Sequence, residues 1–219
     1  MNYQELKKLF APWFEDMGFV ARKPSKNLFI QDRGFYLIIA ELQPLYDYGF
    51  FLNLAVKFLW TDKDILSFDY SEGDSRIYGT PIPHPTGATF FISPTLYAEI
   101  EYMKKQARKL IKKYQKLSKL KILSKKLSSR KDSVVVLNRG YEKRDTDLAI
   151  AKALLGKSSE AGELFSNSLA DYHDPLIKEL SDLRFDKDAF TAKIIEITNG
   201  LRKTLSKKLR IPLEDISSL

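Results

Sequence analysis

The chain has 219 residues, of which 44% are hydrophobic and 12% aromatic, so it can bury a core and is not a disordered protein. It has no cysteine, which excludes disulfides, thiolate metal sites and cysteine nucleophiles and fits a reducing, cytoplasmic location. The net charge is +8, but residues 103–131 hold thirteen basic residues and no acidic one, which leaves −5 on the remainder.

The first hundred residues predict a helix followed by an antiparallel sheet. Residues 2–17 predict an amphipathic helix with one apolar stripe, followed by Gly18 at the position where a glycine ends a helix. Pro12 either kinks this helix or begins it. The residues of the stripe are Leu6, Leu9, Phe10, Trp13 and Phe14. Strands are expected at 28–31, 35–42, 49–60 and 89–92, with a hairpin turn at Asp32-Arg33-Gly34 and a proline-rich loop or edge segment at 68–87.

The second half predicts helices. Ser93 and Pro94 open a long basic helix over 96–127, whose apolar positions repeat like a heptad seam. The seam consists of Leu96, Ile100, Met103, Ala107, Leu110, Tyr114 and Leu117. After a polar break at 128–133 and a short strand at 134–137, further helices are expected at 146–155, 160–170, from Asp174-Pro175 onward, and at 186–209, where Gly200 could bend the last one.

These elements predict an α+β fold, in which an N-terminal helix packs on an antiparallel sheet and a mainly helical C-terminal region follows. The expected division is a sheet domain over 1–95 and a helical region over 96–219. No apolar stretch reaches the roughly twenty residues of a membrane span, and the first ten residues lack the apolar region of a signal peptide. We therefore expect no membrane partner.

Catalytic and metal-binding motifs are absent from the sequence. Gly156-Lys157-Ser158 lacks the earlier glycine and the preceding strand of a phosphate-binding loop, and is interpreted as a helix cap. His84 and His173 have no accompanying partner motif. The acidic group Asp69, Glu72 and Asp74 lacks the spacing of a calcium loop and is interpreted as a solvated turn. No cofactor, metal or catalytic residue is predicted.

The basic segment 104–131 is the one feature that stands out. On a helix, Lys105, Lys109, Lys112, Lys116 and Lys119 lie away from the apolar seam, with Lys126 and others at the flanks. The candidate binding residues are Lys104, Lys105, Arg108, Lys109, Lys112, Lys113, Lys116 and Lys119. This surface could be solvated, meet an acidic protein surface, or follow nucleic-acid phosphates; the scarcity of arginine disfavours base-specific reading.

Several segments resemble a bacterial family of uncharacterised domains. They are Gly18-Phe19, Asn27 to Ile30, Gly34 to Ile39, Leu42-Gln43 and Phe50 to Val56, within residues 6–60, with Ala55 where glycine is usual. The resemblance implies a helix packed on an antiparallel sheet and no established activity. Some similar families look like immunity proteins, which act by binding. Asn53 and Gln43 match pattern positions, and are expected to bond across the sheet or to a turn.

The sequence therefore leaves three functions open. The first is a non-catalytic protein-interaction protein, immunity-like in character. The second is weak, sequence-independent nucleic-acid binding through the basic helix, and the third is an enzyme using His84 or Asp74. A homodimer through the 100–117 seam is a further alternative, because a heptad seam can pair with a second copy of itself.

Overall fold

A computed structural model describes residues 3–22, 27–44, 50–60, 69–71, 76–77, 81–83, 89–91, 97–129, 141–171 and 174–219. Over these residues the predicted α+β fold is confirmed. An N-terminal helix, α1 (Tyr3–Asp16), precedes an antiparallel sheet, and helices follow. The helices are α2 (Tyr97–Gln115), the 3-10 turn η2 (Lys116–Ser118), α3 (Leu120–Ser128), α4 (Tyr141–Leu154), α5 (Ser158–Asp171), α6 (Pro175–Leu183) and α7 (Lys187–Leu209).

The main sheet has five strands in sequential order, each antiparallel to the next. They are β1 (Val20–Ala21), β2 (Leu28–Asp32), β3 (Tyr36–Pro44), β4 (Phe50–Phe58) and β5 (Arg76–Ile77), and a separate pair joins β6 (Pro81–Pro83) to β7 (Thr89–Phe91). The predicted hairpin turn joins β2 to β3. Gly34 has φ +79°, and its N–H donates to Asp32 Oδ1 at 3.0 Å, which closes the turn.

Helices α1 and α2 cover one face of the sheet. In α1, Leu6, Phe10 and Phe14 are buried at the spacing the apolar stripe predicts, and Phe14 stacks on Phe29 of β2 with ring centroids 4.6 Å apart. The helix runs through Pro12 to Asp16, and Gly18, two residues beyond its end, has φ +80°. The even-numbered residues of β3 and β4 supply the sheet side of this core.

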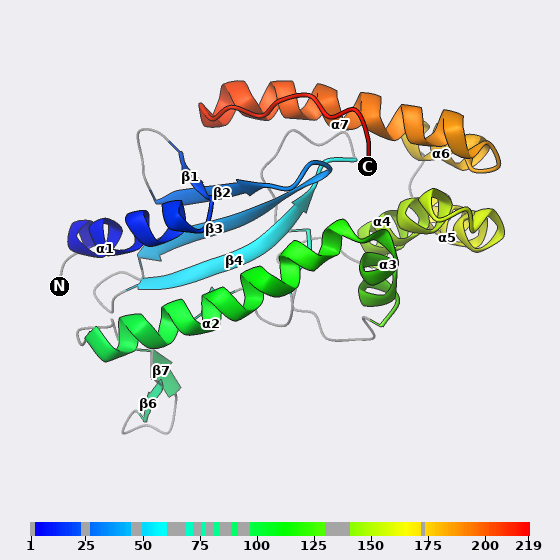
Figure 1. Cartoon of the computed structure of the whole chain (residues 1–219). Helices are drawn as coiled ribbons and strands as arrows, with labels where there is room; N and C mark the ends of the chain where they lie inside the picture. The colour runs from blue at the N-terminus through cyan, green and yellow to red at the C-terminus, as the bar shows by residue number, and fades with distance from the viewer. Residues whose placement is uncertain are drawn as a thin grey trace.

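Helix α7 covers the opposite face of the sheet (Figure 1). Alternate strand residues point to opposite faces, so Leu37, Ile39 and Leu59 form a second core with leucines of α7. The chain then reverses at Arg210, which has φ +54°, and its last residues run back along α7. The sheet therefore lies between helices, whereas the sequence predicted only that the N-terminal helix packs on it.

A buried arginine holds this second layer together. The Arg202 guanidinium of α7 donates to both carboxylate oxygens of Asp32, to Gly34 O at 2.7 Å and to Glu214 O. Its side chain is 2% exposed, whereas that of Asp32 is 36% exposed. The Arg202 side chain thus joins α7, the β2–β3 turn and the C-terminal segment. Its positive charge is balanced by the Asp32 carboxylate.

The C-terminal helices pack pairwise, α4 on α5, α5 on α6 and α6 on α7. Trp60, just after β4, donates its indole N–H to Asp147 of α4 at 2.8 Å, and both side chains are buried. The continuous buried cluster includes residues on both sides of residue 95, from Leu6 to Ile194. The division into domains at residue 95 stays a prediction, and the hydrogen bond from Trp60 to Asp147 crosses that position.

Two details of the predicted basic helix are wrong. A single helix over 96–127 was expected, but α2 ends at Gln115, and Lys119 is extended, with φ −85° and ψ 103°. Leu117 and Leu123 are six residues apart and would lie on different sides of a straight helix; the bend lets both face the core. The second wrong detail is the seam: Leu110 was expected to be part of it but is only half-buried, and Ile111 is buried in its place.

Candidate functional site

The inward side of α2 fixes how the basic segment is presented. Its buried residues are Ile100, Met103, Ala107, Ile111 and Tyr114, followed by Leu117 in η2. They pack on β3 and β4 of the same chain. The seam residues are therefore buried within one chain, and the homodimer through 100–117, which the sequence left open as an alternative, stays a prediction.

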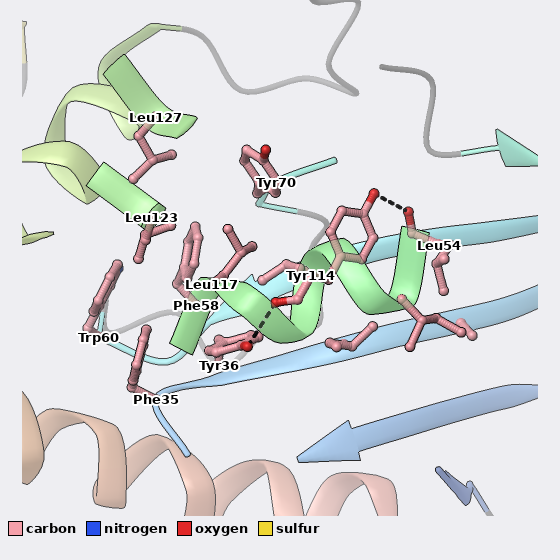
Figure 2. Packing of buried hydrophobic residues seen from close by; sticks show 14 of the residues in the cluster. Phe35, Tyr36, Leu54, Phe58, Trp60, Tyr70, Tyr114, Leu117, Leu123 and Leu127 are labelled. Carbon is pink, nitrogen blue, oxygen red and sulfur yellow. Dashed lines mark hydrogen bonds between the residues drawn. The ribbon is translucent and has the colours of Figure 1, made fainter. Parts of the chain in front are cut away.

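Two tyrosines anchor the end of α2 to the sheet (Figure 2). Tyr36 Oη donates to Tyr114 O at 2.9 Å and to Gln115 O at 3.2 Å, and Tyr114 Oη donates to Leu54 O at 3.3 Å. These bonds satisfy carbonyls that a helix terminus leaves without an intrahelical partner. Burial raises the pKa of the Tyr36 hydroxyl above its ordinary value, against the lowering effect of Arg33.

The outward side of α2 and η2 carries a row of exposed lysines. Lys105, Lys109, Lys112, Lys116 and Lys119 are all exposed, as the helical spacing predicts, and together they are named the lysine face here. From Lys105 to Lys116 the row extends about 16 Å, at about 1.5 Å per residue. Lys113 is also exposed, beside the row. The helix is thus anchored on one side and presents only cationic groups at the centre of the other.

The lysine face is not neutralised within the described part of the chain. None of its five ammonium groups makes an ion pair or hydrogen bond to a described residue. Other lysines do find partners, such as Lys193 with Glu179 at 3.0 Å and Lys203 with Asp215 at 3.3 Å. The sequence has no acidic residue between Glu101 and Asp132 to provide a local one. The positive charge therefore points to solvent.

Two of the eight candidate residues have a structural role at the contact with α1. Lys104 is only 14% exposed; its ammonium lies 3.2 Å from Glu101 and 5.7 Å from the centroid of the Phe10 ring. The guanidinium carbon of exposed Arg108 lies 5.9 Å from the Trp13 ring centroid. Lys104 therefore does not belong to the lysine face, and Arg108 borders it.

The prediction that Asp69, Glu72 and Asp74 form a solvated turn is wrong for Asp69. Asp69 is a buried ion-pair partner: its Oδ2 lies 3.5 Å from Lys57 Nζ and accepts the Phe58 N–H at 2.9 Å. The side chains of Lys57 and Asp69 are 0% and 1% exposed, so each charge depends on the other. Glu72 and Asp74 lie outside the described residues. Among the described residues no group of His, Asp and Glu could hold a metal ion.

The remaining sequence candidates have structural roles or lie outside the description. Gly156 caps α4 with φ +75°, and Lys157 N–H donates back to Lys152 O at 2.9 Å, which confirms the helix-cap interpretation. Asn53 donates to Gln43 Oε1 at 2.8 Å and to Glu41 Oε2 at 3.1 Å, so it bonds across the sheet as expected. His84 and His173 lie outside the described residues.

Sequence reasoning missed Tyr102, which stands exposed on α2. Its spacing of three and seven residues from Lys105 and Lys109 was the available signal. The candidate residues stopped at Lys119, but Lys121 and Lys125, which lie within the predicted basic segment 104–131, are also exposed, on α3 beyond the bend. Exposed lysines of the basic segment therefore occur on both α2 and α3.

No protein-family model, curated protein or solved structure matches the chain. The resemblance of residues 6–60 to the bacterial family stays a prediction. No helix of the described residues combines the length and hydropathy that crossing a membrane requires.

Proposed function

We propose that this chain is a non-catalytic binding protein whose lysine face holds the phosphate backbone of nucleic acid without reading its sequence. The observation that carries the proposal is the row Lys105, Lys109, Lys112, Lys116 and Lys119. All five are exposed, and none is paired with a described residue, on a segment whose other side is fixed in the core.

Counterion release supplies the free energy of such binding. Lysines that neutralise phosphates displace condensed cations, so the affinity falls with salt by a slope of about −0.9 per phosphate on duplex DNA. Five lysines on five phosphates give a slope of about −4.5 in log affinity against log salt concentration. Lysine is a point charge without the bidentate fork of arginine, and this favours phosphate contact over base reading.

The composition of the surface favours nucleic acid over an acidic protein. Protein interfaces are depleted in lysine and centre on buried aromatic or arginine anchors. Apart from Tyr102, the exposed residues of α2 whose side chains are described are all charged: Glu101, Lys105, Arg108, Lys109, Lys112 and Lys113. Such a surface offers phosphates several point charges and offers a protein partner no apolar centre.

Fluorescence anisotropy of labelled, generic DNA and RNA tests the proposal, with purified protein from low to physiological salt. The decisive variant reverses Lys109, Lys112 and Lys116 to glutamate. Its control reverses Lys178, Lys187 and Lys207, which are exposed on α6 and α7 and bring the same change in net charge. We expect the first variant to lose binding and the control to keep most of it.

Three results would overturn the proposal. No binding by the native protein even at low salt would remove nucleic acid as the partner and direct the search to acidic proteins. Equal losses in the two triple variants would show that overall charge, and not the lysine face, governs binding. A salt slope near zero would exclude phosphate contact as the source of affinity.

A further inference from the structure

The lysine face has an exposed aromatic ring at one end. Tyr102 is 46% exposed. Among the described residues, the other exposed large hydrophobic side chains are Val20 and Phe185. On a helix, residues three and seven positions apart share a face, so Tyr102 lies on the same side as Lys105 and Lys109. No hydrogen bond or ring contact to a described residue occupies this tyrosine.

The tyrosines of the core, unlike Tyr102, are not available to a ligand. Tyr36, Tyr70 and Tyr114 are all buried, and the hydroxyls of Tyr36 and Tyr114 bond to backbone carbonyls. The exposed ring of Phe185 lies in the α6–α7 turn with the guanidinium carbon of Arg184 4.2 Å from its centroid, so one of its faces already has a partner. Tyr102 therefore combines a free aromatic ring with adjacent unpaired cations.

We infer that the lysine face is a site for single-stranded nucleic acid, in which Tyr102 stacks on a base while Lys105 and Lys109 hold neighbouring phosphates. This inference rests on the proposed function and names its substrate class. Sequence-independent single-strand binders combine a basic track with an aromatic platform, because every base presents a π-face. The bases of a duplex are stacked on one another and cannot reach the ring, so a duplex meets only the lysines.

The position of the ring suits a flexible strand. Lys105 and Lys109 lie about 4.5 Å and about 10 Å from Tyr102 along the helix axis, at about 1.5 Å per residue. A single strand can turn one base toward α2 while its backbone continues along the row. Beyond Lys116 the chain bends at Lys119, and α3 carries two further exposed lysines, Lys121 and Lys125.

The test compares Tyr102→Ala and Tyr102→Phe with the native protein on three labelled ligands of equal length: an oligo-dT strand, an abasic strand and a duplex. We expect Tyr102→Ala to bind oligo-dT about tenfold more weakly, the loss of one stacked base. Its affinity for the duplex and the abasic strand should stay within twofold of native, and Tyr102→Phe should keep the native preference. The control Phe185→Ala should match the native protein throughout.

The outcomes separate the inference from the proposed function. If the Lys109, Lys112 and Lys116 reversal abolishes binding but Tyr102→Ala binds oligo-dT like the native protein, the phosphate contact stands and the stacking inference is wrong. Equal losses of Tyr102→Ala on all three ligands would also overturn stacking, because an abasic strand has no base to stack. Absence of binding to every ligand overturns both statements.

Discussion

Replacing Arg202 with methionine should destabilise the fold strongly, because the arginine is the buried partner of Asp32. Its side chain is 2% exposed and donates to the Asp32 carboxylate, Gly34 O and Glu214 O. Removing one member of a fully buried pair costs about 3–5 kcal/mol. Asp32 is 36% exposed and regains water in the variant, so we expect the lower end, about 3 kcal/mol.

Equilibrium urea unfolding followed by far-UV circular dichroism measures this loss. The control is Lys203→Met on the adjacent residue of α7. Its pair with Asp215 has side chains 67% and 50% exposed, and such pairs contribute below about 1 kcal/mol. The double variant Arg202→Met with Asp32→Asn should lose less than the sum of the two single changes. A loss below about 1 kcal/mol for Arg202→Met, or strict additivity, would refute the reasoning.

Three further predictions concern the anchors and the helix ends. Tyr36→Phe should cost about 1–2 kcal/mol at pH 7 in urea unfolding. The pKa of Tyr36 is raised in the folded state, so the contribution of its hydroxyl to stability is complete below the ordinary value of 10.0 and is lost as pH rises through the folded pKa. The native protein and Tyr36→Phe should therefore converge in stability above pH 10. A difference that stays constant with pH would contradict this. Gly156→Ala should destabilise by about 1 kcal/mol because φ is +75°, whereas Gly200→Ala, inside α7 with open space around the added methyl, should stabilise by about 0.5–1 kcal/mol; equal signs in thermal melts would refute the assignment. Asp147→Ala should shift the tryptophan-fluorescence and circular-dichroism transitions to lower urea together, because its bond to Trp60 links the sheet to α4; two separated transitions in the native protein would contradict this linkage.

Local signals in the sequence predicted most helix ends. Gly18 and Gly156 end helices because their backbones adopt positive φ, which other residues adopt only with strain. Asp174 begins α6 by accepting the Leu176 N–H at 2.9 Å, and Asp186 begins α7 in the same way. Each of these features depends on residues within a few positions of one another, so the sequence alone contains the whole interaction.

Features that depend on distant residues were not predictable in this way. Arg202 and Asp32 are 170 positions apart, and nothing near either residue indicates that α7 covers the second face of the sheet. Lys57 alternates with apolar residues in β4 and resembles a solvent-facing position, yet Asp69 and the surrounding chain bury it completely. A charged side chain becomes stable in a core only with its partner, and the pairing is a property of the tertiary structure.

The candidate site was predictable where helix geometry alone decides. The exposure of the five lysines follows from 3.6 residues per turn. The inward side was partly wrong, because a heptad seam repeats every 3.5 residues and requires a supercoiled partner helix. Met103, Ala107, Ile111 and Tyr114 follow an eleven-residue period, close to that of a straight helix lying on a sheet.

The charges of the lysine face are not needed for the helix to fold. Like charges four residues apart destabilise a helix by a few tenths of a kcal/mol for each pair, and the segment contains several, including Lys105 with Lys109 and Lys112 with Lys116. Burial of a side chain such as Met103 or Ile111 contributes about 1.5–3 kcal/mol and offsets that repulsion. Glutamates among the lysines would solubilise the surface equally well and add stability. An anionic partner would relieve the repulsion that salt leaves unscreened, which agrees with the proposed contact with phosphates.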